Sequence, residues 1–409
     1  MIVMIEVSLD DAKRLVLDAQ GLRTNNPCKS VVEVAHRIHS IQIDTISVVS
    51  RSHNLITFNR FPEYEDGAIW EYEKKGELFE YWSHALCMMP IETYPFYAWR
   101  RKFYPSPRDK KWAIGHKDTI EEVYRHVKKN GVTNSASIGN SNPESTGWWD
   151  WKVEKRALEH LYTMGKLMVA YRKGFQKYYD LTERVLPGHI DSEPMSDEDA
   201  ADFVVDTSLG SLGIGCYDDI RTYHNKLPSQ KIWKGRKDQI ESYLEQRVKE
   251  GHLEEVTIEG LEDRYFALAK NVDSLNASSM MDLDDSPVKL LTPFDNILRE
   301  RAFPKRIWDF DYTIECYVPA PDRVYGYFVL PILDKSELAG RLDAKVHRKE
   351  GLLEIKALYL ETKDLQSSDG LERLKRGLEE FAQFHNCDSI KITKVTPRKM
   401  TKTVRILFS

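Results

Sequence analysis

The chain has 409 residues, of which 41% are hydrophobic and 30% are charged, and its formal net charge is -5 at pH 7. This composition excludes wholesale disorder, because it supplies enough apolar residues for packed cores. The net charge excludes a uniformly basic nucleic-acid coat but allows a local basic face on an acidic body. A chain of this length is expected to form roughly two to four domains.

The sequence has no apolar run long enough to span a membrane, and residues 1–8 lack the basic and apolar regions of a signal peptide. We therefore expect a cytoplasmic protein. Its cysteines stand singly, so neither a Cys-x-x-Cys metal pair nor an iron–sulfur spacing exists, and reduced thiols without a metal are expected. The five positions are Cys28, Cys87, Cys216, Cys316 and Cys387.

The N-terminal region predicts three helices in the order of a helix-turn-helix element. Residues 7–22 have the apolar spacing of an amphipathic helix, and Ser8 is its expected N-cap. A second helix starts at Ser30 and leads directly into residues 41–54. Aromatic side chains are then frequent in residues 56–107, where a base-stacking platform is possible but a hydrophobic core is the commoner use.

A helix followed by a glycine and a two-stranded hairpin occurs twice further along the chain. Residues 153–164 precede a hairpin at 167–181, and residues 237–249 precede another at 253–269. Together with the N-terminal helices and a strand pair at 78–89, they predict three tandem winged helices. The expected domains are residues 1–107, 108–190 and 191–275.

The last third of the chain changes character. Residues 270–286 are acidic and rich in serine, which is typical of a linker, and the domain after it, residues 286–409, has mostly β-type patterning. One helix is expected at 371–385. Strands are expected at residues 312–317, 324–330, 338–342, 352–360 and 389–395. The predicted fold class is α+β, with tandem winged-helix modules followed by a C-terminal β-rich domain.

Polar residues interrupt an otherwise apolar stretch at residues 41–54. Gln42 and Asp44 flank an isoleucine, and an isolated buried carboxylate is costly, so Asp44 is either paired, near water or functional. The plainer interpretation makes Asp44 the N-cap of a helix over residues 45–54 and Gln42 a surface residue. Residue chemistry alone favours this plainer interpretation.

Residues 42–46, which read QIDTI, together with residues 51–53, which read RSH, resemble the signature of the YcaQ/AlkZ family of bacterial DNA glycosylases. Further similar stretches follow in the family's order, at residues 291–296 (LTPFDN) and 340–345 (GRLDAK). The resemblance implies tandem winged helices, a C-terminal β-domain and monofunctional excision of N7-alkylated purines. The family also repairs interstrand crosslinks. Residues 85–89 (ALCMM) depart from the more acidic pattern of the family.

The active-site motif of this family is Gln, an apolar residue, then Asp or Gln. The resemblance therefore implies that Gln42 and Asp44 are catalytic, in the Gln-x-Asp branch that resembles YcaQ. Ionised Asp44 stabilises the oxocarbenium-like sugar and accepts a proton from water, while the amide of Gln42 holds that water. Side chains two residues apart diverge on a helix, so we expect both before the third helix. Neither a metal nor a Schiff-base lysine is expected.

Double-stranded DNA carrying alkylated purines or crosslinks is the expected partner of a monomer. Candidate phosphate contacts lie beside Asp44 and in a basic loop between two expected strands, although such a loop is also typical of a solvated hairpin tip. The candidate DNA-binding residues are Arg51, His53, Arg341, Lys345, His347 and Arg348. Two alternatives remain open at this stage: a non-enzymatic winged-helix DNA-binding protein such as a transcription regulator, and a protein-interaction scaffold.

Overall fold

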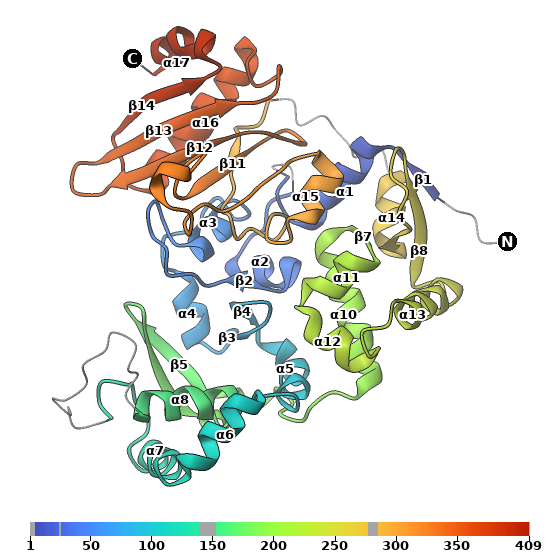
Figure 1. Cartoon of the computed structure of the whole chain (residues 1–409), viewed down its shortest axis with the longest axis vertical. Coiled ribbons are helices and arrows are strands. Elements are labelled where there is room, and N and C mark those ends of the chain that lie inside the picture. Colours follow the sequence, from blue (N-terminus) through green and yellow to red (C-terminus); the bar gives the residue numbers. More distant parts are fainter. Residues whose placement is uncertain (1–4, 24–25, 139–152, 277–284, 409) are drawn as a thin grey trace. The chain divides into compact units, whose positions relative to one another are not determined.

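The computed structural model describes residues 5–23, 26–138, 153–276 and 285–408, which form helices and four small sheets in an α+β arrangement (Figure 1). The chain divides into two compact units. The first combines residues 1–66 with residues 204–409, and the second is residues 67–203. The first unit therefore joins the two ends of the chain, and it contains all of the predicted site residues.

Helix α1 (Leu9–Ala19) begins where the sequence predicts. The Ser8 side chain accepts the backbone N–H of Asp11 at 3.1 Å, which satisfies one of the free donors of the first turn. The strand before it, β1 (Ile5–Val7), pairs in parallel with β8 (Leu253–Ile258). Strand β1 thus completes a sheet whose other strands come from a much later part of the sequence. The strand order of this sheet is β1-β8-β9-β7.

The other elements around this sheet are mostly helices. Helix α2 begins after Ser30, as the sequence predicts, and the Ser30 side chain accepts the N–H of Glu33 at 3.1 Å. The elements are α2 (Val31–Ile38), α3 (Ser52–Phe58), α10 (Asp197–Leu212), β7 (Ile214–Cys216), α11 (Tyr217–Tyr223), α12 (Lys226–Ile232), α13 (Lys237–Lys249), β9 (Tyr265–Leu268), α14 (Ala269–Asn276) and α15 (Ala302–Trp308). One hydrophobic core joins α1, this sheet and α15.

The C-terminal sheet has the order β10-β11-β12-β13-β14. Its strands are β10 (Lys289–Leu290), β11 (Val329–Asp334), β12 (Glu337–His347), β13 (Leu352–Leu360) and β14 (Ser389–Thr396). The pairs are antiparallel except β13 with β14, and a parallel pair needs a crossover, here α16 (Ser368–Phe384). Leu374, Leu378 and Phe381 of α16 are buried in the core of this sheet. Helix α17 (Thr401–Leu407) follows β14.

The predicted strand at residues 312–317 is wrong, because this segment has no regular structure. The carboxylate of Glu315 instead accepts the backbone N–H groups of Val324, Tyr325 and Gly326 at 3.0–3.2 Å. A buried side chain therefore takes the backbone donors that a neighbouring strand would have paired. The strand predicted at 324–330 begins only at Val329.

The second unit contains the predicted strand pair and a second hairpin. Its elements are α4 (Ile69–Lys74), β3 (Leu78–Trp82), β4 (Leu86–Pro90), α5 (Tyr94–Arg101), α6 (Pro107–Gly115), α7 (Lys117–Asn130), α8 (Val153–Thr163), β5 (Leu167–Lys173), β6 (Gln176–Leu181) and α9 (Thr182–Val185). Phe79, Tyr81, Phe96, Tyr97 and Trp99 are each at most 2% exposed. These aromatic side chains form a core rather than a stacking platform.

Both predicted hairpins that follow a helix are present, β5–β6 after α8 and β8–β9 after α13. Their assignment as winged helices and the bounds of the four predicted domains stay predictions. Of the predicted linker, residues 277–284 lie outside the described residues, and its first part is helix α14.

Candidate active site

The structure places Gln42 and Asp44 outside any helix. Gln42 ends the short strand β2 (Ile41–Gln42) and is 8% exposed, whereas Asp44 is half-buried in an irregular segment. The Oδ1 atom of Asp44 accepts the backbone N–H of Ile46 at 2.6 Å, which is a local side-chain turn. Helix α3 begins only at Ser52, so the interpretation of Asp44 as a helix N-cap is wrong.

The surroundings of Asp44 shift its protonation. Burial raises the pKa of its carboxyl, and the hydrogen bond from Ile46 lowers it by less. Burial raises the pKa of the Cys316 thiol, and the charge of Asp44 is the next cause. Cys316 and desolvation are the larger causes that raise the pKa of Tyr317, and the charge of Asp44 adds to them. The irregular segment that the sequence misassigned as a strand therefore comes within electrostatic reach of Asp44. Tyr317 on this segment is 86% exposed.

The segment that carries Asp44 is held on its N-terminal side through the last carbonyl of α2. The Ile38 carbonyl accepts the Tyr223 hydroxyl at 2.7 Å and the Asn296 side-chain amide at 3.0 Å. The same amide donates to the Tyr223 oxygen at 2.9 Å. Both partners are almost fully buried, so this anchor, four residues before Gln42, is shielded from water.

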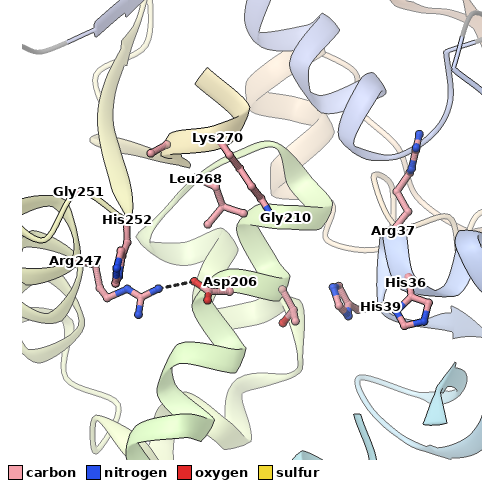
Figure 2. Close-up of a pocket in the computed structure, with 12 residues that line it drawn as sticks. His36, Arg37, His39, Asp206, Gly210, Arg247, Gly251, His252, Leu268 and Lys270 are labelled. Carbon is pink, nitrogen blue, oxygen red and sulfur yellow. Dashed lines mark hydrogen bonds and ion pairs between the residues drawn. The ribbon is translucent and has the colours of Figure 1, made fainter. Parts of the chain in front are cut away.

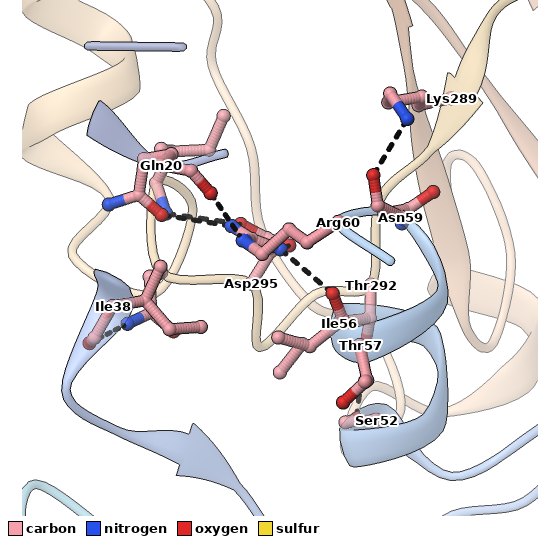
Figure 3. Close-up of polar contacts among 12 residues, drawn as sticks. Gln20, Ile38, Ser52, Ile56, Thr57, Asn59, Arg60, Lys289, Thr292 and Asp295 are labelled. Atoms are coloured by element: carbon pink, nitrogen blue, oxygen red, sulfur yellow. Dashed lines mark hydrogen bonds and ion pairs between the residues drawn. The ribbon is translucent and has the colours of Figure 1, made fainter. Parts of the chain in front are cut away.

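The C-terminal side of the segment is held by a buried ion pair (Figure 3). Arg60, just after α3, donates to the two carboxylate oxygens of Asp295 at 2.8 and 2.9 Å, and both side chains are 0% exposed. The remaining donors of Arg60 reach the backbone and side-chain oxygens of Gln20 at 2.7 and 2.9 Å and the carbonyl of Ile56 at 3.1 Å. The guanidinium therefore joins the end of α1, helix α3 and the segment after β10.

Residues 291–296 therefore clamp both sides of the Asp44 segment. The hydroxyls of Thr292 and Ser52, at the start of α3, lie 3.0 Å apart, which adds a third contact (Figure 3). The sequence marked these residues only as a family-like stretch and missed their supporting role. The available signal was a charged residue, Asp295, between Phe294 and a stretch that continues with Ile297 and Leu298, because a buried carboxylate needs a partner.

The tip of the β12–β13 hairpin contacts the chain after Asp44. The backbone N–H of Val346 donates to the Val48 carbonyl at 3.3 Å, and the Arg348 guanidinium donates to the Val49 carbonyl at 2.6 Å. Arg348 and Lys345 are exposed. The structure thus brings two of the sequence-predicted DNA contacts close to the segment that carries Asp44.

Other predicted contacts have different surroundings. Arg341 lies inside β12 rather than in the loop, is 5% exposed, and pairs with Glu361 at 2.6 and 3.1 Å between two aromatic rings. His53 is 1% exposed in α3, and His347 lies 2.8 Å from a Glu354 oxygen. Arg51, at the N-cap of α3, is partly exposed. Burial makes the side chains of Arg341 and His53 poorly suited to contact a DNA backbone.

A separate pocket of about 770 Å³ opens where α2, α10, α13 and α14 meet (Figure 2). Burial lowers the pKa of its His39 to about 3, so this imidazole is neutral at physiological pH. Asp206 is the one carboxylate among the described lining residues, and it pairs with Arg247 at 2.8 Å. A carboxylate held by an arginine is a poor base, so Asp44 is the better candidate for catalysis.

Two searches of the described residues bear on other classes of function. No helix in the described part of the chain is long and apolar enough to cross a membrane. No group of three or more His, Cys, Asp or Glu residues within the same part could hold a metal ion. None of the five cysteines, all of which lie in the described part of the chain, forms a disulfide.

Residues 35–384 match the model of a protein family described as DNA glycosylase AlkZ-like. Among solved structures, the chain is similar to Streptomyces sahachiroi DNA glycosylase AlkZ, with a TM-score of 0.65 and 16% sequence identity. That match covers 96% of this chain and 100% of the other. At this identity, the structural likeness shows a shared fold.

Proposed function

Because the chain belongs to the AlkZ-like family of DNA glycosylases, we propose that it excises N7-alkylated purines from duplex DNA as a monofunctional enzyme of the Gln-x-Asp branch. Asp44 is the proposed catalytic carboxylate and Gln42 its partner. The observation that carries this proposal is a half-buried carboxylate on a non-helical segment that is anchored on both sides. An anchored carboxylate with access to solvent is what positioning against a sugar requires.

The proposed reaction needs no cofactor. An N7-alkylated purine already carries a positive charge, so it leaves with the electrons of the glycosidic bond as a neutral base. Ionised Asp44 stabilises the positive charge that develops on the sugar. Water then attacks the anomeric carbon and gives its proton to Asp44, while the Gln42 amide orients that water. The products are the free base and an abasic site.

Contacts with DNA are proposed at the exposed groups nearest the Asp44 segment. Arg348 and Lys345 on the hairpin tip, with Arg51 at the start of α3, supply positive charge for phosphates. Crosslinked purines are a second proposed substrate, because Tyr317, within electrostatic reach of Asp44, is 86% exposed and can meet a base that stays near the duplex.

An abasic-site assay tests the proposal. Duplex DNA with a single N7-methylguanine is incubated with the protein, and abasic sites are revealed by alkaline strand cleavage. We expect cleavage at the modified position only, with undamaged duplex as the control. A second arm uses a duplex with an N7-linked interstrand crosslink. A transcription regulator predicts DNA binding without any abasic site, and a protein-interaction scaffold predicts no salt-dependent DNA binding at all.

Tyr317 is expected to contribute to substrate binding. An exposed aromatic ring within electrostatic reach of the proposed catalytic carboxylate can stack on a base, and such stacking is worth about 1–3 kcal/mol. Tyr317→Ala should therefore lower kcat/KM on N7-methylguanine DNA by about 5- to 150-fold. Tyr317→Phe is the matched control and should keep most of the activity. Equal losses in the two variants would contradict stacking, because they would assign the effect to the hydroxyl.

Excision is expected to depend on pH through Asp44. The ionised form is the active one, and burial raises the pKa of this carboxyl, so activity is lost as the pH falls through that raised value. Below it the rate should fall about tenfold per pH unit, starting at a higher pH than for an ordinary aspartate. Single-turnover excision measured across acidic pH checks this. A rate that rises as the pH falls would contradict it, because that would require a protonated catalyst.

A further inference from the structure

The end of the chain has a one-sided charge that the proposed active site does not use. Between Ser389 and Ser409 the sequence contains six lysines and arginines and no aspartate or glutamate. The whole chain, in contrast, has a net charge of -5. The six residues are Lys391, Lys394, Arg398, Lys399, Lys402 and Arg405, which we call the basic edge.

The side chains of the basic edge are open to solvent. All six are exposed, and within the described part of the chain none has a carboxylate within 4.0 Å. Arg405 donates to the Thr393 carbonyl at 3.4 Å, which leaves most of its donors free of carboxylates. Around α17, Arg398, Lys399, Lys402 and Arg405 line a shallow groove of about 530 Å³. Lys391 is the register partner of Glu354 on β13, and the pKa of that carboxyl is lowered by His347 and, to a smaller extent, by Lys391. The excess of positive charge along the rest of the basic edge attracts a polyanion.

The basic edge starts next to the proposed DNA-binding hairpin. Strand β14 is the last strand of the C-terminal sheet, and its Ser389 pairs in register with Leu352, directly after the hairpin turn (Figure 1). From there β14 runs for eight residues to Thr396 before α17 follows. At about 3.3 Å per residue, the strand covers about 25 Å. Duplex DNA rises about 3.4 Å per base pair, so this length matches about seven base pairs.

We propose that the basic edge is a second, sequence-independent binding surface for the phosphate backbone of duplex DNA. It extends the contact beyond the lesion, from the hairpin tip along β14 to α17. The inference takes its ligand from the proposed function but concerns a different surface. All six residues of the basic edge also lie beyond the matched family region, which ends at residue 384. This surface is therefore a feature of this chain rather than of the family region.

Charged residues on an edge strand also have a simpler use, since lysines there prevent edge-to-edge aggregation. That use explains Lys391 and Lys394 on β14, but it does not explain the cations on α17 and in the turn before it. Prevention of edge-to-edge aggregation also requires no excess of positive over negative charge. The two explanations differ in whether removing the charges changes DNA affinity.

The test compares two charge-neutralised variants of the full-length protein. The first carries Lys394→Gln, Lys399→Gln and Lys402→Gln, and the control carries Lys237→Gln, Lys249→Gln and Lys363→Gln, which are also exposed lysines. Binding to an undamaged 30-base-pair duplex is measured by fluorescence anisotropy over a range of salt concentrations. A third variant carries Lys394→Arg, Lys399→Arg and Lys402→Arg and so keeps the positive charges of the basic edge. Thermal melting confirms that all of them are folded.

The first variant should bind about 10- to 500-fold more weakly at 0.1 M salt, and the slope of log K against log salt should fall by about 2 to 3. The control and the arginine variant should match the wild type. A 10-base-pair duplex should show a smaller difference, because it cannot cover both the hairpin and the basic edge. Single-turnover excision at saturating protein should not change.

An unchanged salt slope in the first variant, or an equal loss in the control, would overturn the proposal. Binding of acidic phospholipid vesicles that depends on these lysines, without any change in duplex binding, would overturn it as well. The undamaged duplex separates this inference from the glycosylase proposal. If the protein does not excise the modified base but the first variant still lowers the salt slope, only the catalytic assignment is refuted. If the protein excises the base but the first variant leaves the salt slope unchanged, only the basic edge is refuted.

Discussion

Asp44→Asn is expected to lower the single-turnover excision rate about 1000-fold on N7-methylguanine DNA. The amide cannot accept the proton of the attacking water, and it supplies no negative charge to the sugar. A positioned general base is worth about 100- to 10000-fold, and loss of the charge adds to that. Asparagine has nearly the same volume, and its oxygen can still accept the Ile46 N–H, so the local turn is kept.

The folded state should tolerate this substitution. Because the folded pKa of Asp44 is raised, ionisation is less favourable in the folded than in the unfolded protein, and the penalty grows as the pH rises. Removing the charge should therefore leave the melting temperature at pH 7 unchanged or slightly higher. DNA affinity should be kept, since a negative charge near phosphates has been removed.

Two controls sharpen this experiment. Thr45→Ala changes the exposed neighbour of Asp44 and should leave the rate near that of the wild type. Gln42→Ala should lower the rate by about 10- to 100-fold, less than Asp44→Asn, because it removes the orientation of the water but not the charge. Near-normal excision by folded Asp44→Asn would contradict the catalytic assignment.

Asp295→Asn should be the most destabilising of the substitutions considered. It leaves the charge of Arg60 without its counter-ion in a place that water does not reach. Removing one partner of a buried pair costs about 3–5 kcal/mol in the free energy of unfolding. Urea denaturation followed by intrinsic fluorescence measures this loss through the unfolding midpoint.

Asp309→Asn is the matched control for the lost charge. Asp309 pairs with Lys305 at 2.6 Å, but its side chain is 88% exposed, and a solvent-screened surface pair of this kind contributes little to stability. Its backbone has φ 49°, which asparagine tolerates. A similar small loss in both variants would contradict the clamp.

Asp295→Asn should also affect catalysis, in a way that separates positioning of the catalytic carboxylate from the chemical step. Asp295 is buried and does not face the substrate in the proposed mechanism. Asp295→Asn should therefore lower the excision rate indirectly, by loosening the Arg60–Asp295 ion pair that holds the end of α3. A stabilising osmolyte should partly restore the rate of Asp295→Asn but not that of Asp44→Asn. Equal rescue of the two variants would remove the distinction between a supporting and a catalytic carboxylate.

Local patterns predicted many elements well because their causes are local. Ser8 caps its helix as expected, a second helix begins after Ser30, and α13 has the predicted bounds, since capping and apolar spacing act within a few residues. The β12–β13 hairpin is also present where alternation indicated it, although β12 extends further to His347. The strand expected at 312–317 is absent, and there the Glu315 side chain accepts backbone N–H groups 9 to 11 residues further along the chain, a contact that apolar alternation does not encode.

The amino-acid order alone contained the Gln42 and Asp44 motif, the family resemblance and the unbalanced charge of the last residues. It could not show that Arg60 and Asp295 meet, because 235 positions separate them along the chain. Nor could it separate exposed Arg348 from buried Arg341, which are alike in charge and close in sequence. Burial and pairing are properties of packed neighbours, so only the tertiary structure decides which charges support the fold and which can meet DNA.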